Sequence, residues 1–114
     1  MVSKETEKKL AQLQLIEENL SHVATKKQAM QTEEFEIKNA LDELKKAKGD
    51  VYRIVGQIMI KSDVEDITKE LNSSKDMVEL KLKSIEKQEL SLQEKFKTVK
   101  AEVMGLLNKE EEKK

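Results

Sequence analysis

Apolar residues recur at alternating intervals of three and four over most of this chain, and its 114 residues include no proline. A mean spacing of 3.5 residues places one stripe of side chains along one side of an α-helix, as in a coiled coil. Eight of ten such positions in the first half are apolar, and eight of nine in the second half. We call these positions the seam: Leu13, Ile16, Leu20, Val23, Lys27, Met30, Glu34, Ile37, Leu41, Leu44, Val78, Leu82, Ile85, Glu89, Leu92, Phe96, Val99, Val103 and Leu106. The pattern predicts a mainly α-helical fold in which two long helices pack along the seam.

The two helices are expected over residues 4–48 and 63–108, with a solvated, frayed charged tail at 109–114. The phase of the apolar repeat slips around Asn72-Ser73-Ser74, where three weak helix formers follow one another. A slip of this kind inside a coiled-coil pattern indicates a local stutter rather than an interruption. The second helix is therefore expected to be continuous.

The expected helix ends carry capping signals. Gly49 follows a lysine-rich last turn and is expected to end the first helix in a left-handed conformation. Ser62 and Glu65 have the spacing of a capping box, in which each side chain binds the backbone N–H of the other residue. Ser62 is therefore the predicted N-cap of the second helix.

The segment between the helices, residues 51–61, is rich in β-branched side chains and has Gly56 near its centre. This composition predicts a β-hairpin with its turn at Val55-Gly56-Gln57. A lone two-stranded hairpin is marginal in water and has two unpaired edges, so we expect it to pair with hairpins of other subunits in an inter-subunit β-barrel. The side chains expected at this assembly surface are Val51, Tyr52, Ile54, Val55, Ile58 and Ile60.

A short connection between helices of nearly equal length folds them back as an antiparallel pair. A turn at Val55-Gly56 determines which seam positions face each other. In that register Lys27 lies diagonally across from Glu89, and Glu34 lies diagonally across from Lys75. We therefore predict two ion pairs whose role is to fix the register.

The free ends of the two predicted helices carry more apolar side chains than a two-helix seam requires, because Leu10, Met104 and Leu107 fall outside it. Methionine is common on surfaces that adapt to many partners, because its thioether side chain is flexible. The pattern leaves two interpretations open, an adaptive binding tip and plain coiled-coil packing. The candidate tip residues are Leu10, Leu13, Val103, Met104, Leu106 and Leu107.

The composition argues against catalysis and against several kinds of partner. The chain has no cysteine and one histidine, His22, so neither a thiolate site nor a site with two histidine ligands can form. Its 22 basic and 23 acidic residues are interspersed, unlike the basic face of a nucleic-acid or membrane binder. No apolar run approaches the length of a membrane span. We expect a non-enzymatic protein without cofactor, metal, nucleic acid or membrane partner. The absence of cysteine allows an intracellular, reducing compartment, and the expected location is the cytoplasm.

The hairpin segment resembles that of the archaeal beta-type prefoldin family. The resemblance rests on a hydrophobic-Tyr-basic pattern at Val51-Tyr52-Arg53, then Gly56, then an aliphatic triplet and a basic residue at Ile58-Met59-Ile60-Lys61. The Gln88-Glu89 pair in the second predicted helix is also similar to the family's pattern. The resemblance covers the whole chain, residues 1–114, as a single prefoldin-like unit. The space between the helices admits only one hairpin, which indicates the beta type.

The resemblance implies a hetero-hexamer of two alpha-type and four beta-type subunits, whose hairpins form a β-barrel platform from which coiled coils project. It implies that unfolded client proteins are captured at the coiled-coil tips without ATP and are passed to a group II chaperonin. The remaining alternative is a structural coiled-coil adaptor or spacer, in which the helices dock a partner helix. Suppression of the aggregation of an unfolded protein would separate the two.

Overall fold

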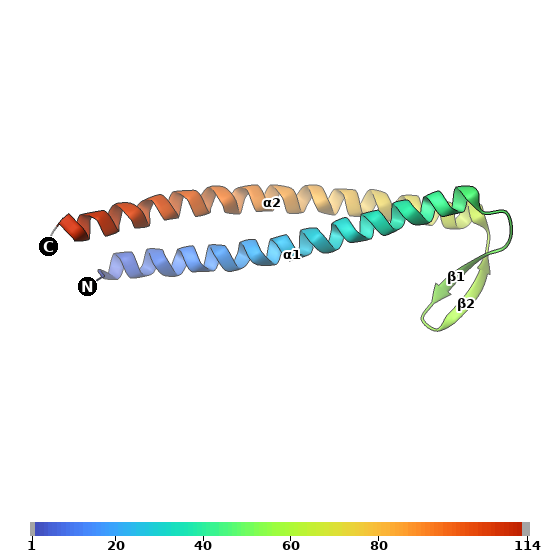
Figure 1. Ribbon diagram of the computed structural model, residues 1–114, viewed down its shortest axis with the longest axis horizontal. Coiled ribbons are helices and arrows are strands. Elements are labelled where there is room, and N and C mark those ends of the chain that lie inside the picture. Colours follow the sequence, from blue (N-terminus) through green and yellow to red (C-terminus); the bar gives the residue numbers. More distant parts are fainter. Residues whose placement is uncertain (1, 113–114) are drawn as a thin grey trace. The chain divides into compact units, whose positions relative to one another are not determined.

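The structure, a computed structural model, describes residues 2–112 as two long helices with a β-hairpin between them (Figure 1). The predicted mainly helical fold is confirmed. The elements in chain order are α1 (Lys4–Lys46), β1 (Val51–Val55), β2 (Ile58–Ser62) and α2 (Val64–Glu112).

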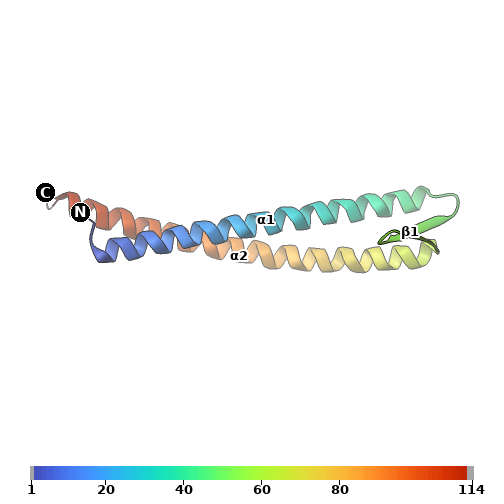
Figure 2. The ribbon, with the colours of Figure 1, turned by 90° about the horizontal axis from the view of Figure 1, so that it is seen from below.

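The described chain divides into two compact units. The terminal unit contains residues 2–27 and 84–112, and the hairpin unit contains Gln28–Lys83. Within each unit, a segment of α1 lies beside an antiparallel segment of α2 (Figures 1 and 2). This arrangement follows from the short hairpin connection, which reverses the direction of the chain.

Each unit has its own hydrophobic cluster along the seam. In the terminal unit Ile16, Val99 and Val103 are buried, and Leu13, Leu20, Phe96 and Leu107 pack against them. In the hairpin unit Ile37, Val78 and Leu82 are buried, and Met30, Leu41 and Leu71 pack against them. The spacing of three and four therefore identified the packed face of both helices. From Leu13 the same spacing continues toward the start of α1, to the half-buried Lys9 and the buried Thr6.

The predicted stutter is visible in the burial of α2. The helix is continuous from Val64 to Glu112, yet its inward-facing residues Ile67, Leu71 and Lys75 follow one another at intervals of four. The alternation of three and four resumes from Lys75 to Val78. Two successive intervals of four shift the phase of the packed face without breaking the helix.

Both predicted caps are wrong in detail. α1 ends at Lys46, where the backbone N–H of Ala47 donates to the carbonyl of Leu44 at 3.3 Å in a tightened last turn. Among the described residues only Gly56 has a positive φ, so Gly49 is not a left-handed cap. The N-cap of α2 is Asp63 rather than Ser62.

The cap of α2 moves by one residue because β2 extends through Ser62. The Ser62 hydroxyl donates to the carbonyl of Ile60 at 3.2 Å, and a carboxylate oxygen of Asp63 accepts from the backbone N–H of Glu65 at 3.1 Å. An ionised side chain suits the positive end of the helix dipole. The neighbouring aspartate therefore replaces the serine as the cap.

The expectation of a frayed tail is wrong for residues 109–112, which continue α2; residues 113 and 114 lie outside the described part of the chain. The physical reason is a contact with the start of α1. The Glu110 carboxylate accepts hydrogen bonds from the backbone N–H of Ser3 and from the hydroxyl of Thr6, both at 2.9 Å. These bonds hold the last turns of α2 in place.

The β-hairpin closes with a two-residue loop, Gly56-Gln57, between the paired residues Val55 and Ile58. Gly56 has a φ of 61°, in the region that favours glycine. A glycine of positive φ at the first loop position is the feature of a type II′ turn, whose twist matches that of the strands. The predicted turn at Val55-Gly56-Gln57 is therefore one residue too long, and the hairpin extends one residue beyond the predicted segment, to Ser62.

The predicted register is confirmed at one of its two polar seam contacts. Lys27 Nζ lies 3.1 Å from a carboxylate oxygen of Glu89. Glu34 instead pairs with Lys38, four residues along its own helix, at 3.6 Å, and residues 2–112 contain no ion pair between Glu34 and Lys75. An exposed neighbour on the same helix is an equally good partner when pair energies are small.

Reversing one charge of the Lys27–Glu89 pair should destabilise the terminal unit. The side chains are only 29% and 21% exposed, so a Lys27→Glu variant sets two partly buried carboxylates against each other. We expect Lys27→Glu to lower the unfolding free energy by about 1 kcal/mol, and Lys27→Glu with Glu89→Lys to recover most of the loss. Thermal unfolding followed by circular dichroism measures both. Lys26→Glu, on the exposed neighbour, is the control; an equal loss there would show that the contact is irrelevant.

Candidate functional site

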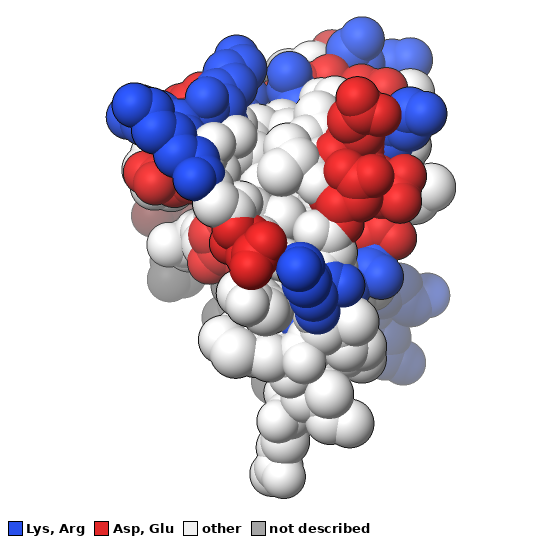
Figure 3. All heavy atoms as spheres, turned by 90° about the vertical axis from the view of Figure 1, so that its right-hand side faces the viewer, with Lys and Arg blue, Asp and Glu red and all other residues white. Residues whose placement is uncertain are grey.

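The β-hairpin holds the largest group of exposed apolar side chains in the described chain. Figure 3 shows it as a largely uncharged surface that projects beside helices carrying charges of both signs. Six large apolar residues of the hairpin are between 47% and 69% exposed. They are Tyr52, Ile54, Val55, Ile58, Met59 and Ile60. Val51, the remaining predicted assembly residue, is half-buried.

The observed strand pairing distributes these side chains over both faces of the hairpin. Ile54 pairs with Met59, and Val55 pairs with Ile58. Residues paired across two antiparallel strands lie on the same face, and neighbours along a strand lie on opposite faces. Tyr52, Ile54 and Met59 therefore share one face, and Val51, Val55, Ile58 and Ile60 share the other. Met59 was not among the predicted assembly residues, although its position between Ile58 and Ile60 places it on the same exposed hairpin.

The hairpin is also incomplete as a sheet. Within the described residues the sheet contains only β1 and β2, so each strand has one edge without a partner strand. Free strand edges pair readily with other strands, and an isolated hairpin with two exposed apolar faces is marginally stable. Both edges and both faces therefore favour contact with further chains.

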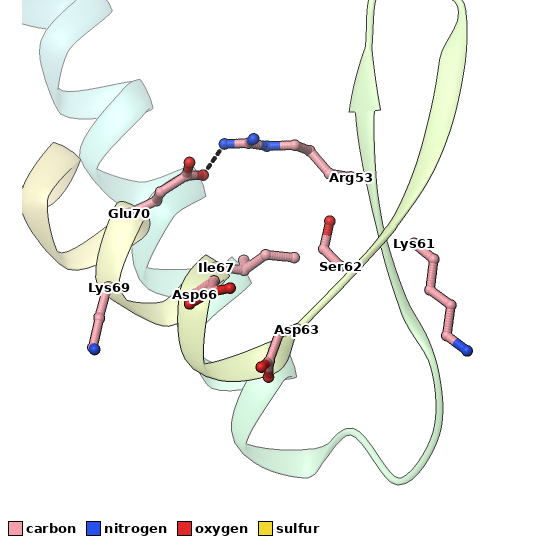
Figure 4. Close-up of a pocket in the computed structure, with 8 residues that line it drawn as sticks. All are labelled: Arg53, Lys61, Ser62, Asp63, Asp66, Ile67, Lys69 and Glu70. Carbon is pink, nitrogen blue, oxygen red and sulfur yellow. Dashed lines mark hydrogen bonds and ion pairs between the residues drawn. The ribbon is translucent and has the colours of Figure 1, made fainter.

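Ionic contacts fix the base of the hairpin. Arg53 of β1 forms an ion pair with Glu70 of α2 (Figure 4), and Lys61 lies 3.5 Å from Asp50. The depression that Figure 4 shows between the hairpin and α2 is lined by three basic and three acidic residues. Their charges balance, so the depression lacks the single-sign field that an anion or cation site requires.

The candidate tip residues of the terminal unit divide into packed and exposed groups. Val103 is buried, Leu13 and Leu107 pack against the cluster of Ile16, and Leu106 is half-buried. Leu107 was expected outside the seam; it packs because it lies one turn beyond Val103 on the same side of the helix. Leu10 is 40% exposed and Met104 is 53% exposed. Of the six candidates, these two are the exposed apolar side chains at the tip.

A polar contact at the same end was not foreseen from the sequence. Thr6 is fully buried, and its hydroxyl donates to the Glu110 carboxylate. The hydrogen bond from the Ser3 backbone, and then that from the Thr6 hydroxyl, lower the pKa of Glu110 below its ordinary value. No local pattern signals this contact, because the partners are more than 100 residues apart in the sequence.

His, Asp and Glu side chains of residues 2–112 nowhere gather in threes that could hold a metal ion. His22 is exposed on α1, next to the buried seam residue Val23. Neither described helix is apolar enough over a sufficient length to cross a membrane.

Comparison with known proteins gives a consistent result. Residues 7–110 match the model of a family described as prefoldin subunit. A "Prefoldin subunit beta" of Saccharolobus islandicus is 32% identical over 107 residues, which cover 92% of this chain and 85% of the relative. The Archaeoglobus fulgidus protein of the same name is 33% identical over 101 residues, or 87% of each chain. The crystal structure of the prefoldin beta subunit from Thermococcus strain KS-1 is similar with a TM-score of 0.84 and 30% identity, covering 92% of this chain and 94% of that one.

Proposed function

The chain belongs to the prefoldin subunit family, a family of chaperone subunits, and from this premise we propose that it is the beta-type subunit of an ATP-independent chaperone. In this proposal the chain assembles with alpha-type subunits and further beta copies into a hetero-hexamer. It captures non-native proteins at the free ends of its helices and delivers them to a group II chaperonin. Its place of action is the cytoplasm.

The exposed hairpin carries the proposal. Its six large apolar side chains occupy both faces, and both strand edges lack partners within the described chain. Burying one such side chain contributes about 1.5–3 kcal/mol, so pairing of several hairpins supplies ample free energy for assembly. A closed barrel would also remove the free edges. The hairpin surface that we propose for assembly consists of Val51, Tyr52, Ile54, Val55, Ile58 and Ile60, with Met59 added.

The exposed tip side chains Leu10 and Met104 support the client-binding part of the proposal. Each offers a small apolar contact, and a methionine side chain adapts to differently shaped partners. A single small contact binds weakly, but several tips in one assembly act together and raise the overall affinity. The proposed client surface is therefore the exposed pair Leu10 and Met104, with the half-buried Leu13, Leu106 and Leu107 and the buried Val103 behind it.

The decisive experiment measures aggregation of an unrelated, chemically unfolded protein in the presence of this subunit assembled with an alpha-type partner. We expect light scattering by the aggregating client to fall as the chaperone concentration rises. No nucleotide should be needed, because the proposed client surface at the tip binds apolar segments directly. Added group II chaperonin with ATP should then recover native client. A structural adaptor would leave the scattering unchanged, and that result would reject the chaperone proposal.

A further inference from the structure

The first turn of α1 is capped by a side chain from the other helix. Ser3 precedes the helix, and its hydroxyl oxygen accepts from the backbone N–H of Thr6 at 3.2 Å, which is the bond an N-cap serine makes. In a capping box, a side chain three residues into the helix reaches back to the backbone N–H of the N-cap residue. Here that N–H is bound by Glu110 of α2 at 2.9 Å. The two helices thus complete one cap together.

Two polar groups at the start of α1, the Ser3 backbone N–H and the Thr6 hydroxyl, donate to this single carboxylate. The same oxygen of Glu110 accepts from the Ser3 backbone and from the Thr6 hydroxyl, and the Ser3 and Thr6 hydroxyl oxygens lie 2.9 Å apart. Thr6 is the one fully buried side chain in the described chain. Loss of the carboxylate would remove the acceptor of both donors and leave the buried Thr6 hydroxyl with the Ser3 hydroxyl as its remaining partner, which weakens the contact between the two helices.

This contact lies immediately beyond the apolar cluster of the terminal unit. Glu110 is one helical turn past Leu107 and two turns past Val103, which is 3% exposed. Helix ends fray because their last backbone groups lack intrahelical partners. The contact therefore joins the two helices just beyond the turns that pack over Val103 and Leu107.

We propose that Ser3, Thr6 and Glu110 form a latch that closes the apolar end of the terminal unit, and that opening of the latch governs access to Val103 and Leu107. The consequence for client capture rests on the function proposed above, whereas the latch itself does not. When the latch is closed, Leu10 and Met104 are the exposed contacts; when it opens, the packed side chains behind them join the surface. The latch thus makes the apolar area of the tip adjustable.

Charged side chains of both helices lie in the same part of the terminal unit. Lys9 of α1 pairs with Glu102 of α2, and these line a shallow depression together with Glu5 and Lys109. The amino group of Met1 lies outside the described residues. The pKa of Glu110 is depressed below its ordinary value of 4.5 by its hydrogen bonds to Ser3 and Thr6. A depressed pKa stabilises the closed form above pH 4.5, and this contribution is lost as the pH falls through the lowered value.

A single introduced thiol tests the latch directly, because the chain contains no cysteine. In the assembled protein carrying Val103→Cys, we expect Glu110→Ala to raise the rate of thiol labelling roughly tenfold, a size within the range expected for loss of a charged hydrogen-bond acceptor. Glu111→Ala removes the same charge from the exposed neighbouring residue and should leave the rate unchanged. Equal labelling in the two variants would overturn the proposal.

Hydrogen exchange provides a second measurement that does not depend on the introduced cysteine. Amides of residues 4–10 and 107–112 should exchange faster in Glu110→Ala than in Glu111→Ala, and those around Leu20 should not differ. The stability difference between the native chain and Glu110→Gln should shrink as the pH is lowered below 4.5. Equal amide exchange rates in Glu110→Ala and Glu111→Ala would reject the latch. A stability difference between the native chain and Glu110→Gln that does not change with pH would also reject it. Aggregation assays with the same variants report on capture separately, so failure of the chaperone proposal would not be mistaken for failure of the latch.

Discussion

A subunit in which Ile58 and Ile60 are both replaced by aspartate is expected to fold and to remain unassembled. Both side chains are exposed in the isolated chain, at 64% and 47%, so aspartate there meets water and costs the monomer little. In an assembly the same positions become buried. An unpaired charge buried at an interface costs about 3–5 kcal/mol, and every beta copy would carry two. Native mass spectrometry with a co-expressed alpha-type subunit measures the outcome.

The matched control for this experiment is the pair Leu80→Asp and Leu90→Asp. These leucines are 67% and 61% exposed, comparable to the two isoleucines, but lie on α2 away from the hairpin. We expect the control to assemble as the native chain does, and circular dichroism should show native helix content in both variants. Hexamers of normal mass from the hairpin variant would exclude the hairpin as the assembly surface. Loss of assembly in the control alone would place that surface on α2.

Replacing Leu10 and Met104 together by serine should weaken client capture strongly while leaving the assembly intact. The two side chains are the exposed members of the candidate tip residues, one from each helix. At roughly 25 cal/mol per Å² of buried apolar surface, their removal weakens the free energy of client binding by about 1 kcal/mol or more for each tip in contact. Because several tips bind one client, the losses add, and we expect at least a roughly tenfold reduction in apparent affinity. Titration with a fluorescently labelled unfolded protein measures it.

The chain itself offers the control for this prediction. Leu15 and Leu90 are also one residue from each helix of the terminal unit, and they are 56% and 61% exposed. The variant Leu15→Ser with Leu90→Ser removes at least as much exposed apolar surface at positions further from the chain ends. If both double variants lose affinity equally, capture depends on the whole helical surface rather than on the tip. Unchanged capture by the tip variant would remove Leu10 and Met104 from the binding site.

The sequence was sufficient for the features that depend on local geometry. A spacing of three and four residues defines one side of a helix whatever its partner is, so the seam predicted the buried residues Ile16, Ile37, Val78 and Val99. The slip at Asn72-Ser73-Ser74 likewise located the stutter in α2. Gly56 marked the turn of the hairpin, because few other residues adopt its positive φ without strain. Each of these signals acts within a few residues of chain.

Only the tertiary structure decided which polar side chains meet. Exposed ion pairs contribute ~0–1 kcal/mol, too little for sequence spacing to select one partner over another, so Glu34 pairs with Lys38 rather than with the predicted partner Lys75. The faces of the hairpin required the observed pairing of Ile54 with Met59, because a shift of one residue would exchange its two faces. The carboxylate of Glu110 reaches Ser3 and Thr6 because α2 returns past the start of α1. Helical periodicity determines the side of a helix on which a residue lies, whereas the chain reversal and the local side-chain geometry determine the residue it meets.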